Sequence, residues 1–305
     1  MSGSIPVPAP LERMAIHTIT TKPWSLRECI DNYRRENVPA ITVWRQALAP
    51  QGPQESARML ADSGLKVVAL VRGGFFTAKE AATRQLAFDD NLRALDEAAT
   101  IGAPLVVLVC GATPGLPLPD ARRQIAEALA KLAPQAQARK VRLAIEPLHP
   151  MYAADRSAVL TMKQARELCA AFTAELENSA SCPACARRLV GIAVDVYHVW
   201  WDETLEQEIA AAGRLGLLHA FHVCDWRVQT RDLLNDRGLM GEGCINIKQI
   251  RKWMEGAGFN SWVEVEIFSN ERWAGDQQVW LKDIIRAYQE HVWKSETRNP
   301  KSEGN

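Results

Sequence analysis

Short apolar runs alternate with helical segments along almost the whole chain, which leaves few folds open to it. Strict alternation of strand and helix is typical of α/β proteins with a parallel sheet. Repeated eight times, it predicts a single (β/α)₈ barrel, a fold that needs about 250 residues. A doubly wound open sheet is the alternative. The strand-like runs cover residues 14–20, 40–44, 66–71, 104–110, 141–147, 189–195, 217–224 and 262–268.

Four of these runs carry an ionisable side chain at or near their ends, namely Glu146, Asp195, His222 and Glu266. An isolated carboxylate inside a strand costs several kcal/mol to bury unless a partner compensates its charge. In a barrel, the carboxyl ends of the strands meet at one mouth, where active sites form. One divalent metal ion bound by all four residues would explain their positions, whereas four unrelated buried polar groups at matched depth would be a coincidence.

Small residues lie beneath these candidate ligands, because alternate residues of a strand share one face. Ala144, Ala193 and Ala220 come two positions before the first three ligands, and bulkier residues occupy most of the positions between. This pattern fits strands that pack one face on helices and line a narrow barrel interior with the other. Glu264 takes the inward face about 6 to 7 Å below Glu266. There we expect it to form a buried pair with an inward Arg or Lys.

Three carboxylates and one imidazole suit a hard to borderline divalent cation. Mn²⁺, Mg²⁺ or Co²⁺ is therefore the expected cofactor, with Zn²⁺ as an alternative. Two further histidines are expected at the same mouth. His17 lies near the end of the first strand and His149 follows the fifth strand, so each is a candidate substrate contact. For His149, ordering of its own loop is an equal alternative.

Composition restricts the partners of the chain. Its 305 residues include 36 Lys plus Arg and 36 Asp plus Glu, so they carry no formal net charge. Binding to nucleic acid requires a cationic surface, so no nucleic-acid partner is expected. No run approaches the roughly 20 apolar residues of a membrane span, and the short, proline-rich N-terminus does not resemble a signal peptide. We expect no membrane partner, and homo-oligomerisation stays open.

Seven cysteines are scattered along the chain, and their odd number favours reduced thiols and a cytoplasmic location. Cys182 and Cys185 form a lone CxxC without a second pair, which we interpret as part of a surface loop rather than as a zinc site. Polar composition predicts flexible tails at residues 1–10 and 294–305. The catalytic barrel is therefore expected to cover residues 11–293.

Around the four candidate ligands the chain resembles the xylose isomerase-like TIM barrel superfamily, and within it the sugar (phosphate) isomerase/epimerase family. The resemblance extends over about residues 12–290. Its most specific stretches are IEP at 145–147, DVYH at 195–198, FH at 221–222, GEGCINIKQI at 241–250 and VEI at 265–267.

The resemblance implies a role for each matching residue. Glu146, Asp195, His222 and Glu266 would bind one divalent metal ion. Glu146 and Glu266 would also flank the substrate as catalytic acid and base. His198, three residues after the aspartate, would contact substrate oxygens.

The residue that anchors the substrate departs from the family pattern. Some epimerases have an arginine six residues after the strand-seven histidine, but this position is Val228 here. Arg227 or Arg231 is expected to take its place in substrate binding. Both lie in the segment 225–243, which is long for a βα loop and rich in charge and glycine, as is typical of loops that cover an active site.

Together with the resemblance, the site predicts a metal-dependent isomerase or epimerase of a sugar, keto-sugar or inositol derivative. A base would remove a proton next to a carbonyl, and the metal would stabilise the enediolate. The same intermediate would serve a lyase or dehydratase, such as a 3-dehydroshikimate dehydratase-like or keto-glycoside-eliminating enzyme, so this alternative stays open. Six histidines and zero net charge disfavour an endonuclease IV-like enzyme. The complete ligand set disfavours a non-catalytic sugar-binding accessory subunit.

Overall fold

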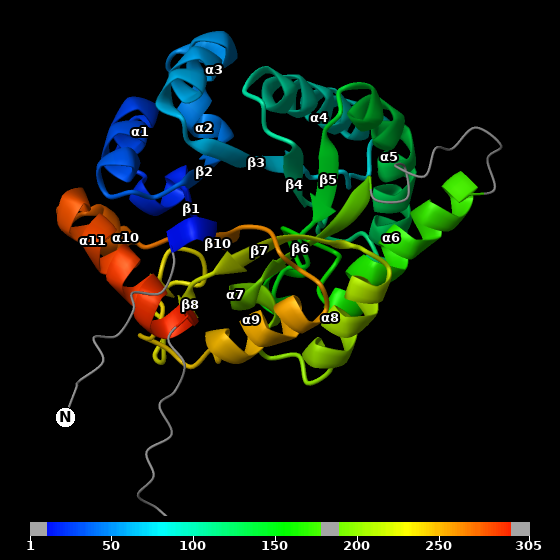
Figure 1. Ribbon diagram of the computed structural model, residues 1–305. Helices are drawn as coiled ribbons and strands as arrows, with labels where there is room; N and C mark the ends of the chain where they lie inside the picture. Colours follow the sequence, from blue (N-terminus) through cyan, green and yellow to red (C-terminus); the bar gives the residue numbers. More distant parts are fainter. Residues whose placement is uncertain (1–10, 178–188, 294–305) are drawn as a thin grey trace, which may run out of the picture.

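Parallel strands close into a barrel in this computed structural model, which describes residues 11–177 and 189–293 (Figure 1). The barrel strands are β1 (Met14–His17), β2 (Ala40–Trp44), β3 (Lys66–Gly74), β4 (Leu105–Val109), β5 (Arg142–Ile145), β6 (Val190–Asp195), β7 (Leu218–Val223) and β10 (Val263–Val265). They pair in the order β1-β10-β7-β6-β5-β4-β3-β2, and β1 pairs with β2 to close the ring. The closed order confirms the predicted (β/α)₈ TIM barrel and excludes the open doubly wound sheet.

Some predictions concern residues outside this part of the chain. The two predicted tails, residues 1–10 and 294–305, fall outside the described residues, as do Cys182 and Cys185. Within the described residues, no helix combines the length and the hydrophobicity needed to cross a lipid bilayer.

Helices surround the barrel and connect its strands (Figure 1). Ser25 begins α1 (Leu26–Arg35) with a capping box, in which its hydroxyl accepts a hydrogen bond from the backbone N–H of Glu28 and the Glu28 carboxylate accepts one from Ser25. Gly64 ends α3 (Gly52–Ser63) at a φ of 75°, which favours glycine. The other helices are α2 (Arg45–Leu48), α4 (Ala81–Thr100), α5 (Leu118–Ala138), α6 (Met162–Glu177), α7 (Val196–Val199), α8 (Leu205–Arg214), α9 (Ile247–Gly256), α10 (Asn270–Trp273) and α11 (Gln277–Ala287), with short helical turns at Leu11–Arg13, Thr18–Thr21, Pro150–Tyr152 and Tyr288–Trp293.

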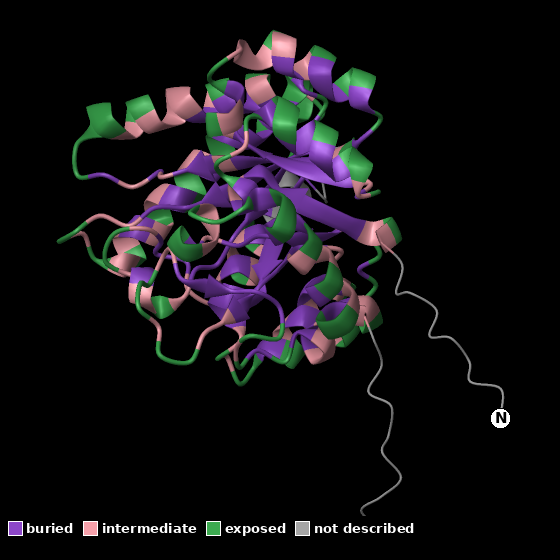
Figure 2. Cartoon of the chain, turned by 90° about the vertical axis from the view of Figure 1, so that its left-hand side faces the viewer, coloured by how far each residue is buried: buried purple, intermediate pink, exposed green. Residues whose placement is uncertain are grey.

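The strands are buried on both faces, and Figure 2 shows them almost entirely in the colour of buried residues. Ala144, Ala193 and Ala220 pack inside the barrel, as the alternating pattern predicts. Bulky residues from the intervening positions, such as Leu143 and Phe221, pack outside against the helices. Because the inward side chains are small, the barrel interior has room for polar side chains at its mouth.

The long loop after β7 folds around a short antiparallel ribbon of β8 (Asp225–Trp226) and β9 (Arg237–Gly238). The buried carboxylate of Asp225 organises this loop by accepting hydrogen bonds from three backbone N–H groups. These belong to Trp226 at 2.8 Å, Gly241 at 2.9 Å and Ile245 at 3.0 Å. The ribbon brings Arg237 back to the barrel mouth, although this residue is distant in sequence from the strand ends.

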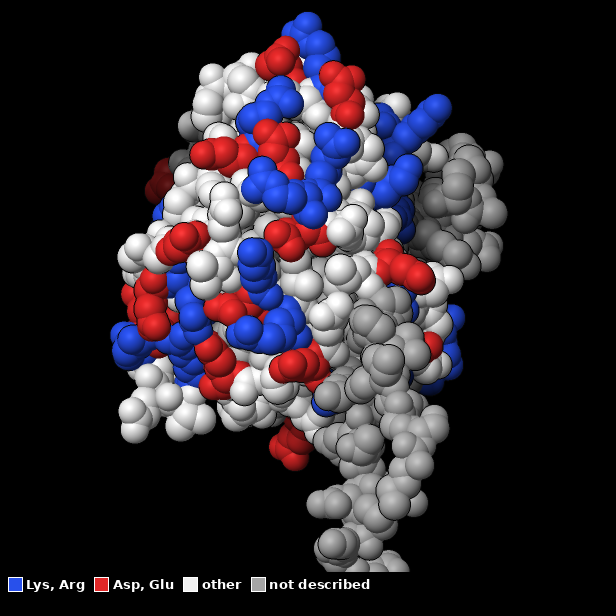
Figure 3. Space-filling model, turned by 60° about the vertical axis from the view of Figure 1, so that its left-hand side comes forward, with Lys and Arg blue, Asp and Glu red and all other residues white. Residues whose placement is uncertain are grey.

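Charged side chains of both signs intermingle on the face shown in Figure 3. Lys and Arg do not form a continuous area there, because Asp and Glu lie between them. This face is therefore unlike the cationic surface that nucleic-acid binding requires.

Candidate metal centre and active-site cavity

Four buried side chains from neighbouring strands converge at the carboxyl-terminal mouth of the barrel. Glu146 directly follows β5, Asp195 ends β6, His222 lies in β7 and Glu266 directly follows β10. One ligand atom from each lies within 4.8 Å of the others, and none of the four residues is more than 5 % exposed. The sheet register places Asp195 beside His222. The structure thus brings together all four residues that the sequence places at strand ends.

The electrostatics of these residues fit a site for a divalent cation. Burial raises the pKa of Asp195 to about 7, and the negative charges of Glu266 and Glu146 add to this effect. Burial works against a charged His222 ring, but its hydrogen bond to Glu146, at 2.9 Å, and the charge of Glu264 outweigh burial and raise its pKa to about 10. Asp195 and His222 thus hold protons more strongly than usual, as expected of oxygen and nitrogen donors arranged for a cation.

Arg237 adds a positive charge that the sequence-based predictions do not include. Its Nη1 donates hydrogen bonds to Asp195 Oδ2 and Glu266 Oε2, both at 2.9 Å, and its Nη2 lies 3.2 Å from Nε2 of His198. The residue is 3 % exposed. The sequence gives one indication of this position of Arg237. The apolar pair Leu-Met at 239–240 indicates that this part of the loop is buried, but it does not indicate which residues Arg237 contacts.

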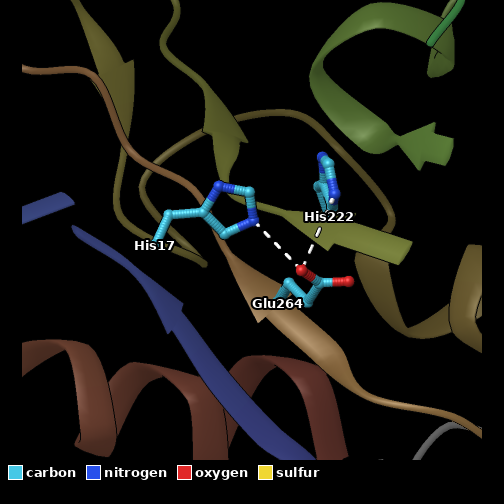
Figure 4. Close-up of side chains that lie close together, drawn as sticks. All are labelled: His17, His222 and Glu264. Carbon is cyan, nitrogen blue, oxygen red and sulfur yellow. Dashed lines mark ion pairs between the residues drawn. The ribbon is translucent and has the colours of Figure 1, made fainter. Parts of the chain in front are cut away.

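Beneath the four converging residues, Glu264 points between two histidines (Figure 4). Its Oε2 lies 3.3 Å from Nε2 of His17 and 3.9 Å from Nε2 of His222, and it accepts a hydrogen bond of 2.5 Å from the Thr42 hydroxyl. The expected partner was an Arg or Lys, but the narrow barrel interior here holds imidazole rings instead. Glu264 faces Nε2 of His222, the ring nitrogen that points away from Glu146. In metal sites, a carboxylate behind a histidine ligand orients its ring in this way.

His17 lies beside the ligands rather than at the surface of the cavity. Its Nδ1 is 2.9 Å from Glu266 Oε1, and the residue is fully buried. Burial opposes a charge on the ring, but the charge of Glu266 and hydrogen bonds to Glu264 and Glu266 together raise the pKa of His17. The structure therefore places His17 where it supports two glutamates, without exposing it to a substrate.

The two other histidines predicted to contact substrate occupy different environments. His198 lines the cavity, where burial and the nearby charge of Arg237 lower its pKa well below the usual value and keep it neutral. His149 does not line the cavity. Its Nδ1 accepts a hydrogen bond from the backbone N–H of Met151 at 3.2 Å, and its ring packs on Trp226 at 4.9 Å. These contacts favour the second expectation for His149, that it orders its own loop.

Arg227 and Arg231 lie in an ion-pair network on the outer side of the loop. Both contact Asp236 and Glu271, and Arg227 also contacts Glu242. Neither arginine lines the cavity, because these acidic side chains hold both of them outside it. The residues that the loop does contribute to the cavity are Leu234, Asn235 and Arg237.

A cavity of about 460 Å³ opens at the four converging residues. Of the four converging residues, only Glu146 and Glu266 line it, while Asp195 and His222 are covered. Aromatic side chains of Trp44 and Trp273 form part of its wall. Its volume suits a small organic molecule.

The family model of the xylose isomerase-like TIM barrel matches residues 29–284, a range that includes all four converging residues. The chain belongs to this family. The protein SMc04130 from Sinorhizobium meliloti 1021 is 41 % identical to this xylose isomerase-like barrel, and the alignment covers 93 % of this chain and 100 % of that chain with a TM-score of 0.86. No curated protein matches the chain.

More distant solved structures share the fold of this xylose isomerase-like barrel. The IOLI protein, whose structure contains a zinc atom, is 18 % identical with a TM-score of 0.77, and the alignment covers 92 % of this chain and 98 % of that chain. D-Psicose 3-epimerase, in a structure with D-fructose, is 14 % identical with a TM-score of 0.70, and the alignment covers 90 % of this chain and 96 % of that chain.

Proposed function

We propose that the protein is a divalent-metal-dependent isomerase or epimerase of a sugar, keto-sugar or inositol derivative. The observation that carries this proposal is the buried group of three carboxylates and one imidazole, with ligand atoms within 4.8 Å of one another, at the base of a sugar-sized cavity. The structural similarity to D-psicose 3-epimerase supports a carbohydrate substrate. The zinc atom in the IOLI structure supports Zn²⁺ as an alternative to Mn²⁺, Mg²⁺ or Co²⁺.

The four ligands would divide into two pairs with different roles. Asp195 and His222 are covered and would only hold the metal ion, whereas Glu146 and Glu266 face the cavity and could also touch the substrate. The bound ion would polarise the substrate carbonyl and stabilise negative charge on its oxygen. One glutamate would remove the proton from the carbon next to the carbonyl, and the other would return it. Return to the opposite face of the same carbon gives an epimer, and return to the neighbouring carbon gives an isomer.

The surroundings of Glu266 favour its ionised form, which a base requires. Burial raises the pKa of this carboxyl group, but the positive charges of His17 and Arg237 outweigh burial and hold the pKa well below its usual value. Neutral His198 and charged Arg237 line the cavity next to Glu266 and would bind substrate oxygens.

Solvent-deuterium exchange tests this function. The metal-reconstituted protein would be incubated in D₂O with a panel of keto-sugars and inososes, and NMR would detect deuterium that enters a substrate C–H bond. We expect exchange in the unaltered protein and a loss of several orders of magnitude in Glu146→Gln and Glu266→Gln, because glutamine cannot accept the proton. Glu271→Gln, a change outside the cavity, is the matched control. Exchange that persists in both active-site variants would show that neither glutamate is the base.

A further inference from the structure

The active-site cavity carries positive charges that the metal centre does not use. Arg72, Arg156 and Lys22 line the same cavity as Glu146 and Glu266. Two of these cations, Arg72 and Arg156, are only partly exposed, whereas Lys22 is exposed.

Within the described part of the chain, Arg72 and Arg156 have no carboxylate at ion-pair distance. The guanidinium carbon of Arg72 lies 4.2 Å from the ring centre of Phe75, and that of Arg156 lies 5.5 Å from the ring of Tyr152. Aromatic faces attract cations only weakly compared with a carboxylate. Other arginines at this mouth do have acidic partners: Arg45 pairs with Asp90 and Glu97, Arg227 with Asp236, Glu242 and Glu271, Arg237 with Asp195 and Glu266, and Arg272 with Glu242.

The two unpaired arginines also repel each other. Burial lowers the pKa of Arg72, and the positive charges of Arg156 and Arg45 lower it further. Arginine nevertheless keeps its proton in proteins, so this repulsion cannot be relieved by deprotonation. An anion between the two guanidinium groups would relieve it.

Both arginines are held on rigid backbone. Arg72 lies at a register shift in β3, and its neighbours Val71 and Gly73 pair with Val107 and Leu108 of β4. The carbonyl oxygen of Arg156 accepts a hydrogen bond of 2.9 Å from the N–H of Gly111, which ties its loop to the end of β4. The two charges are therefore positioned before any ligand binds, as in preorganised binding sites.

We propose that the substrate is an acidic sugar derivative whose carboxylate or phosphate group binds to Arg72 and Arg156, while its carbonyl end faces Glu146 and Glu266. The guanidinium group binds the oxygen pairs of carboxylate and phosphate in a bidentate manner, and such charge-assisted hydrogen bonds are stronger than neutral ones. The orientation of the substrate rests on the proposed function, since it places the reacting end at the two glutamates. The anion site itself depends only on the two arginines.

Three ketoses that differ only at carbon 6 test the anion site. Calorimetric titration of the metal-loaded protein would compare D-fructose, D-fructuronate and D-fructose 6-phosphate, which carry a hydroxyl, a carboxylate and a phosphate at this carbon. We expect at least one anion to bind about tenfold or more tightly than D-fructose. The anion that shows the gain identifies the group that the site accepts. Equal affinities for all three sugars, or no binding by any of them, would overturn the proposal.

Variants of the two arginines locate the effect. We expect Arg72→Gln combined with Arg156→Gln to abolish the preference for the anion over D-fructose. Arg72→Lys keeps the positive charge and should retain part of the preference. This variant distinguishes a loss that is due to the missing charge from one that is due to misfolding of the glutamine variant. Arg58→Gln, an exposed change on α3, is the control. A preference that survives in the double variant would overturn the assignment.

Proton exchange separates this inference from the proposed function. If the anion preference depends on the arginines but no substrate C–H exchanges with D₂O, the anion site stands and the isomerase proposal fails. If exchange occurs equally with neutral sugars and their affinity matches that of the anions, the isomerase proposal stands and the anion site fails.

Discussion

His222 has a carboxylate near each ring nitrogen, but only Nδ1 lies within hydrogen-bond distance of one. Nδ1 lies 2.9 Å from Glu146 Oε1, and Nε2 faces Glu264 Oε2 at 3.9 Å. Glu264 also contacts His17 and Thr42. A carboxylate in this position fixes the orientation of the imidazole and increases its basicity as a ligand. Its contribution should therefore appear as metal affinity even though Glu264 is not one of the four proposed ligands.

We expect Glu264→Gln to weaken metal binding by about 10- to 100-fold, the usual effect of removing a carboxylate behind a histidine ligand. Competition with a chromogenic chelator would measure the affinity. Glu290→Gln changes an exposed carboxylate and should leave it unaltered. An affinity in Glu264→Gln equal to that of the unaltered protein would show that Glu264 only fills space.

Metal binding should release protons. The pKa of His222 is raised to about 10 and that of Asp195 to about 7, so both hold protons near neutral pH and must lose them to become ligands. The affinity should therefore rise with pH, by more below pH 7 than above it, and roughly one to two protons should leave per metal ion near neutrality. Titration calorimetry in buffers of different ionisation enthalpy would count them. An affinity that falls as the pH rises would contradict these protonation states.

At the scale of elements, the β8–β9 ribbon connects the long loop to the four converging residues. Asp225 fixes the ribbon through three backbone N–H groups, and β9 carries Arg237 to Asp195 and Glu266. The loop therefore contacts Asp195 and Glu266 through one buried cation, Arg237, while Arg227 lies in the outer ion-pair network.

Asp225→Ala would leave the three N–H groups without their acceptor. Each buried, unsatisfied N–H group costs about 1 to 3 kcal/mol, and water can reach some of the loop, so we expect a loss of about 2 to 4 kcal/mol in the free energy of unfolding. Urea denaturation would measure it. Asp232→Ala removes an acceptor from two exposed N–H groups, of Leu234 and Asn235, and should cost less than 1 kcal/mol, about the effect of an ordinary surface substitution. Equal losses in the two variants would mean that Asp225 does not organise the loop.

At the scale of the whole molecule, the barrel and the convergence of the four strand-end residues were predictable from local patterns. Strand periodicity places Glu146 and Asp195 on inward faces, and barrel closure brings the strand ends together. These two facts are sufficient to predict that the residues converge, without knowledge of any loop. Arg237 was not predictable, because its position depends on how a long loop folds back through Asp225. Nor was it predictable that Arg72 has no carboxylate partner among the described residues. This depends on residues distant in sequence, which no pattern within β3 reveals.

The number of metal ions bound per chain tests the central claim most directly. Elemental analysis of the protein after reconstitution and removal of unbound metal should give one divalent ion per chain. His222→Ala should give close to none, because it removes the one nitrogen donor of the group, whereas His291→Ala, a change at an exposed histidine, should still give one. A protein that binds no metal after reconstitution, or a His222→Ala variant that still binds one ion per chain, would contradict the account.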